Sequence, residues 1–65
     1  MPAVGMRAIV QHLALDVEAV VQEVSDEGRR VTVLTADGET MEFTLRRSTG
    51  RFHAAGSGPR LKLCP

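Results

Sequence analysis

The sequence has few of the residues that usually reinforce small domains. Cys64 is the only cysteine, so no disulfide can form within the chain. The only histidines are His12 and His53, and neither they nor Cys64 are spaced as in a C-x-x-C or H-x-x-x-H metal motif. A domain of about 60 residues buries only about 60% of the surface of its unfolded chain. Because we expect neither a metal nor a cofactor, stability must come from a compact core or from association between copies.

Long apolar segments are also missing. No stretch approaches the ~18 apolar residues that a membrane-spanning helix needs. Arg7, His12 and Asp16 interrupt the apolar residues near the N-terminus, so the pattern of a secretory signal is absent. Together with the single free cysteine, these absences favour a cytoplasmic protein. We expect one small domain over residues 1–65, in which residues 1–5 are a loose N-terminal end.

The sequence also lacks the motifs of common enzymes. Residues 56–60 contain two glycines but have neither the spacing of a P-loop nor a following helix. The positions of the two histidines do not suggest a Ser-His-Asp or Cys-His catalytic set. A chain of 65 residues built from strands has little room for a ligand pocket of a few hundred Å3. We therefore expect that the protein is not an enzyme.

The clearest pattern that is present is a β-hairpin in the middle of the chain. Residues 30–36 and 39–46 each alternate apolar and polar side chains, as half-buried strands do. Asp37-Gly38 joins the two segments and predicts a two-residue type I′ turn, in which both residues have positive φ.

The segment before this hairpin has two interpretations. Residues 13–24 alternate as a strand that turns back at residues 25–28. Alternatively, residues 6–24 carry an apolar stripe with the spacing of a helix. The stripe consists of Met6, Val10, Leu13, Val17, Val20 and Val24. The number of β-branched valines favours the strand, with a β-bulge at Val20-Val21 that restores the alternation.

The C-terminal part predicts further short strands. Residues 48–50 form a turn, residues 51–54 a short strand, residues 56–59 a loop, and residues 60–63 an edge strand. Arg60 and Lys62 on the solvent face of that strand would discourage aggregation. We expect an all-β fold, a small antiparallel meander or an SH3-like or OB-like barrel of four or five short strands. The alternative is an α+β fold, with an N-terminal helix packed on a β-hairpin or a three-stranded sheet. The expected core residues are Val17, Val21, Val31, Val33, Met41, Phe43, Leu45, Phe52, Leu61 and Leu63.

Acidic residues are absent from one end of the chain. Residues 1–45 contain three cations and eight acids, and residues 46–65 contain five cations and no acid. Such asymmetry is a common feature of interaction surfaces. The simplest interpretation is that the two groups pair or mix across neighbouring strands on a solvated surface. The others are a basic patch that faces phosphate and an electrostatic contact between copies.

The best candidate site surrounds the predicted turn at residues 48–50. Positive φ at Gly50 could direct backbone N–H groups at an anion, and the hydroxyls of the turn could add donors. Arg51 offers a planar fork for phosphate, and Phe52 could stack on a base, although a small domain needs it in the core. The candidate binding residues are Arg46, Arg47, Ser48, Thr49, Gly50, Arg51, His53, Arg60 and Lys62.

These observations lead to two functional hypotheses. The first is a binding module that contacts another protein, or its own copies, through a sheet edge or a valine-rich face. The second is a module that binds single-stranded RNA or DNA through residues 46–62. Zero net charge and only two aromatic residues fit a dedicated nucleic-acid binder poorly. The sequence alone therefore favours protein interaction or self-assembly.

Overall fold

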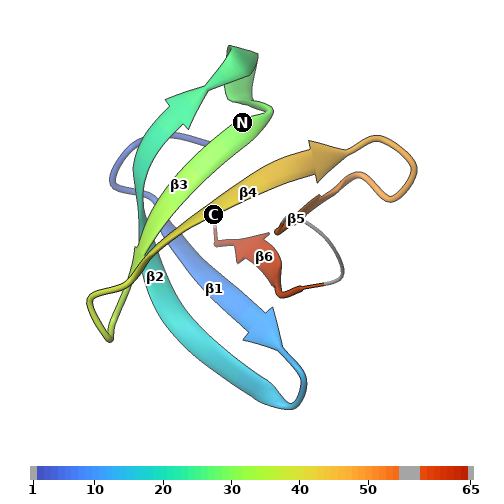
Figure 1. The fold of residues 1–65 in the computed structure, drawn as a ribbon. Coiled ribbons are helices and arrows are strands. Elements are labelled where there is room, and N and C mark those ends of the chain that lie inside the picture. The colour runs from blue at the N-terminus through green and yellow to red at the C-terminus, as the bar shows by residue number, and fades with distance from the viewer. Residues whose placement is uncertain (1, 55–57, 65) are drawn as a thin grey trace.

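The fold is a closed barrel of six antiparallel strands, described by a computed structural model that gives residues 2–54 and 58–64 (Figure 1). The strands are β1 (Arg7–His12), β2 (Leu15–Ser25), β3 (Arg30–Thr35), β4 (Thr40–Arg46), β5 (Arg51–His53) and β6 (Arg60–Leu63). Over the described ranges, the only helical element is the short 3-10 turn η1 (Asp26–Gly28). The predicted all-β fold is confirmed, and the α+β alternative is wrong.

The strand β1 is the element that the sequence pattern did not predict. It pairs with β2, where Val10 lies opposite Val17, and with β6, where Val10 lies opposite Leu61. Because β6 also pairs with β5, it is not the edge strand that we expected. β1 therefore raises the strand number above the expected four or five and closes the sheet on itself.

β2 is long and contains the predicted irregularity. Its pairing with β3 shifts register between Val21 and Glu23, so Gln22 is the extra residue of a β-bulge. The bulge lies just after the predicted Val20-Val21 position. Val21 points into the core before the bulge, and Val24 is half-buried after it. The bulge thus keeps both valines on the inner face of a bent strand.

The predicted hairpin forms from β3 and β4, but its turn differs. The N–H of Thr35 donates to the carbonyl of Glu39 at 2.8 Å, which leaves three residues in the turn. Gly38 has a φ of +86°, whereas Asp37 does not have a positive φ. The two-residue type I′ turn is therefore wrong, because the Thr35–Glu39 pairing leaves room for Ala36 and needs positive φ only at glycine.

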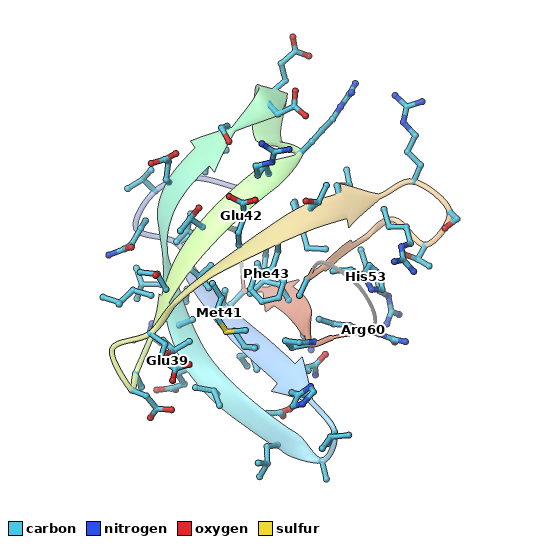
Figure 2. The ribbon with its side chains drawn as sticks, in the orientation of Figure 1. Glu39, Met41, Glu42, Phe43, His53 and Arg60 are labelled. Carbon is cyan, nitrogen blue, oxygen red and sulfur yellow. The ribbon has the colours of Figure 1, made fainter. Side chains whose placement is uncertain are left out.

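Side chains on the inner face of all six strands fill the barrel. The fully or almost fully buried apolar residues are Ala8, Val10, Ala19, Val21, Val31, Val33, Phe43, Phe52 and Leu61. Four other predicted core residues, Val17, Met41, Leu45 and Leu63, are partly buried and pack against this cluster. Figure 2 shows Met41 and Phe43 projecting from β4 into the space that the strands enclose. Of the nine buried apolar residues, Ala8, Val10 and Ala19 were missing from the predicted core.

The two ends of the described chain are both held by backbone hydrogen bonds. The N–H of Gly5 donates to the carbonyl of Val21 at 2.8 Å, and the N–H of Val21 donates to Met6 at 2.9 Å. The expectation of a loose end over residues 1–5 is therefore wrong for Gly5. At the other end, the N–H of Cys64 donates to Arg7 at 2.9 Å and extends the β1–β6 ladder. The loop expected at residues 56–59 lies partly outside the described residues.

Candidate nucleic-acid interface

The barrel separates the two signs of charge. All eight acidic residues lie on β2, on η1, in the β3–β4 turn or on β4. In contrast, the described parts of β1, β5, β6 and the β4–β5 turn carry cations and no carboxylate side chain. We call the five cations from the end of β4 to β6 the basic side. They are Arg46, Arg47, Arg51, Arg60 and Lys62.

Strand register brings most of these cations together on the outer surface. Phe52 and Leu61 are buried opposite each other in β5 and β6, so the residues that flank them point outward. Arg51 lies opposite Arg46 on β4, and Arg60 lies opposite His53 on β5. Directly opposite residues have Cβ atoms about 4.5–5.5 Å apart, which places these cations within reach of one ligand.

A groove runs along this surface. Its volume is about 490 Å3, so the expectation that the chain has little room for a pocket of a few hundred Å3 is wrong. Its lining includes Arg51, Arg60 and Lys62. Gln11 of β1, which lies opposite Arg60, adds an amide, and Gly50 adds backbone. No carboxylate side chain is among the described residues that line it. A concave surface with three cations and an amide is suited to an anion that carries several oxygen acceptors.

The cations of the basic side do not pair with acids. Within residues 2–54 and 58–64, the only salt bridge is Arg30–Glu42, at 3.8 Å between Nε and Oε1. Both of these side chains are exposed. Figure 2 shows His53 and Arg60 on neighbouring strands, apart from Glu39 and Glu42. The interpretation that the charges pair across strands is wrong for this part of the chain, because β1, between β6 and the acidic β2, contains no acid.

The turn between β4 and β5 does not form the anion-binding backbone that we expected. Gly50 has the predicted positive φ, +68°. However, the N–H groups of Thr49 and Gly50 both donate to the carbonyl of Arg46, at 3.3 and 2.8 Å. The N–H of Arg51 donates to Oγ1 of Thr49 at 3.3 Å. These donors are used within the turn, so that part of the candidate site is wrong. Arg47 and Ser48 are exposed at the turn and do not line the groove.

His53 is the titratable group at the centre of the basic side. Partial burial, and then the positive charges of Arg46, Arg60 and Arg51, lower its pKa from the ordinary value of 6.5. Its Nε2 lies 3.0 Å from Oγ1 of Thr49. In the neutral tautomer with a proton on Nδ1, Nε2 accepts a hydrogen bond from that hydroxyl. A bound anion would oppose the effect of the arginines and favour the charged imidazolium.

The two aromatic residues offer almost no exposed ring on this surface, although Phe52 is among the residues at the base of the groove. Phe52 is 7% exposed and Phe43 is fully buried. Phe52 thus belongs to the core, and stacking on a nucleic-acid base is not available to it. Sequence reasoning missed Gln11 as a groove residue, because the strand that places it opposite Arg60 was not predicted.

Comparison with protein-family models, with curated protein sequences and with solved structures gives no match for this chain. The described residues include no group of three or more histidine, cysteine or acidic side chains that could hold a metal ion. The part of the chain that the structure covers has no helix with the length and hydrophobicity of a membrane span.

Proposed function

We propose that the protein is a non-enzymatic binding module for single-stranded nucleic acid, which it holds by the phosphate groups along the basic side. The groove lined by Arg51, Arg60 and Lys62, without a carboxylate among its described lining residues, is the observation that carries this proposal. Free cations on neighbouring strands gain more from an external polyanion than cations that already have an acidic partner. A cytoplasmic location is part of the proposal and agrees with the free thiol of Cys64.

The geometry is less favourable to the two protein-binding surfaces that the sequence suggested. Both sides of β6 are paired within the closed barrel, so that strand offers no free edge. Val21, Val31 and Val33 are at most 1% exposed, so the valine-rich face lies inside the barrel. We therefore place nucleic-acid binding first.

Recognition by this surface is expected to be independent of base sequence. The groove supplies cations for the backbone, but Phe52, the aromatic residue among its lining, is only 7% exposed and offers little surface for stacking. Neutralising phosphates releases counterions, so affinity should fall steeply as salt rises. For single strands, the slope of log K against log salt is about −0.7 per phosphate neutralised, which gives about −2 for three groove cations.

The test is fluorescence anisotropy with a labelled mixed-sequence oligonucleotide of about 15 nucleotides, near the upper end of the site sizes of small domains that bind single strands. Affinity is measured between about 50 mM and about 200 mM salt, for the native protein and for the double variant Arg51→Gln/Arg60→Gln. We expect the variant to bind more weakly and to reduce the salt slope by about 1.4, for two lost phosphate contacts.

Arg30→Gln is the matched control, because Arg30 is an exposed cation outside the basic side that already has an acidic partner, Glu42. It should leave both affinity and slope unchanged. The proposal is wrong if the native protein does not bind at low salt, or if Arg30→Gln weakens binding as much as the double variant.

A further inference from the structure

The turn between β1 and β2 exposes leucine at the end of a hairpin. We call residues 12–15 the tip. Leu13 is 93% exposed and has a φ of +55°, and Leu15 is 69% exposed. Positive φ is uncommon for a residue that is neither glycine nor asparagine, and it is unfavourable for a bulky side chain. Within the single chain, these leucines bury little surface that would offset the strained backbone.

A second apolar feature lies on the outer face of β1, β2 and β3. This groove encloses about 560 Å3, and Ile9, Val20 and Leu34 are among its lining residues. Val20 lies opposite Leu34 and is 44% exposed, while Leu34 is 36% exposed. Arg7 and Glu18 also line the groove and carry its charge. We call it the outer groove. Arg7 is the cation among its described lining residues, and none of the five cations of the basic side lines it.

We propose that the tip of one copy of this protein docks into the outer groove of a second copy. A concave apolar surface fits a projecting apolar end, so Leu13 and Leu15 of one copy would pack against Val20 and Leu34 of the other. This single contact accounts for both exposed features. Burial of the leucines in a partner would offset the cost of presenting them to water.

The tip of a chain cannot fill the groove of the same chain. Leu15 and Val20 belong to the same strand, β2, and are separated by five residue steps. At about 3.3 Å per residue, an extended strand holds them roughly 17 Å apart. The occupant must therefore come from another molecule.

Charge complementarity supports a second copy as that molecule. Asp16 is exposed directly after the tip leucines, and Arg7 is exposed at the outer groove, opposite Val20. Neither takes part in a salt bridge within the described residues. Docking with Asp16 of one copy beside Arg7 of the other, and away from Glu18 of the same groove, is the orientation that the charges favour.

The contact joins two different surfaces, and each copy offers one tip and one outer groove. Two copies can therefore pair reciprocally in a two-fold dimer, or successive copies can join in rings or open chains. The basic side takes no part in it, so this inference does not depend on nucleic-acid binding.

Sedimentation velocity from about 10 µM to about 1 mM covers the range in which weak association is populated. We expect the sedimentation coefficient of the native protein to rise with concentration. The tip variant Leu15→Ser and the groove variant Val20→Glu should each remain monomeric. Val4→Ser is the matched control, because Val4 is a 68% exposed apolar residue outside both surfaces. It should associate like the native protein.

Mixing the two defective variants gives the decisive result. Leu15→Ser retains an intact groove and Val20→Glu retains an intact tip, so together they should form a 1:1 dimer and nothing larger. Circular dichroism checks that each variant is folded, and Leu34→Lys replaces Val20→Glu if the latter is not. A native protein that stays monomeric, a tip variant that still associates, or a mixture that fails to pair would each overturn the proposal.

Discussion

The backbone of Leu13 gives a direct test of whether the tip stores strain. We expect Leu13→Gly to stabilise the single chain and Leu13→Ala to leave its stability nearly unchanged. At the φ of +55°, a residue other than glycine costs about 1–2 kcal/mol. Glycine removes that cost but loses about 0.4–1 kcal/mol through its greater freedom in the unfolded chain.

Little else changes at this position, because the side chain of Leu13 is 93% exposed and loses almost no buried area on substitution. The net gain for glycine is therefore about 0.5–1 kcal/mol. Alanine keeps both the positive φ and its cost, so it serves as the control for removal of the exposed side chain.

The assay is urea unfolding followed by circular dichroism, at a protein concentration low enough that association between copies does not contribute. Equal stabilisation by alanine and glycine would mean that the exposed side chain, not the backbone, is unfavourable. No gain from glycine would refute the claim of strain. If the tip also mediates self-association, Leu13→Gly should gain stability and lose association in the same preparation.

Three further results are expected. Phe43→Ala should lower the free energy of unfolding by about 3–5 kcal/mol, because Phe43 is fully buried; a thermal melt that shows a loss below about 1 kcal/mol would contradict its central position. Because the pKa of His53 is lowered in the folded state, the unfolded chain takes up this proton more readily, so stability should fall as pH is lowered through 6.5. Urea midpoints on both sides of that pH check this, and His53→Gln should show a smaller decrease than the native protein. Glu42→Gln removes an exposed salt bridge to Arg30 and should change stability by less than about 1 kcal/mol in low salt; a larger loss would show that the pair is not merely a surface contact.

The central hairpin and most of the core could be predicted from local pattern. In β3 and β4, the alternation of apolar and polar residues predicts two strands, and Gly38 predicts the turn that joins them. The two strands pair across that short turn. The turn itself was misjudged because Asp37-Gly38 also occurs in three-residue turns. Choosing between the two requires the pairing of Thr35 with Glu39, which is not a local property.

The strand β1 shows where local pattern is insufficient. Ile9 and Val10 are both apolar, yet Val10 is buried and Ile9 is only half-buried on the outer face. That contrast depends on the neighbours that β2 and β6 supply, and one of those neighbours lies near the other end of the chain. The helical spacing of Met6, Val10 and Leu13 added a competing signal.

The candidate site could be predicted only in part, because local pattern places some of its residues and pairing between distant strands places the others. Alternation correctly places Arg60 and Lys62 outward on β6, around a buried Leu61. The role of Gln11 and the use of the Gly50 N–H within its own turn depend on tertiary pairing and on hydrogen bonds, so the sequence did not indicate them.

The pairing of β1 with β6 closes the barrel, and we call this pairing the seam. Ala8 lies opposite Leu63, so this pairing joins segments that are almost the whole chain apart, and its closure costs more conformational entropy than closure of a hairpin. The proposed phosphate groove takes Gln11 from one side of the seam and Arg60 and Lys62 from the other. A polyanion bound there would contact both strands and stabilise their pairing. It should therefore slow amide hydrogen exchange in β1 and β6 more than in the β3–β4 hairpin. Binding would then stabilise the strand pairing that closes the barrel.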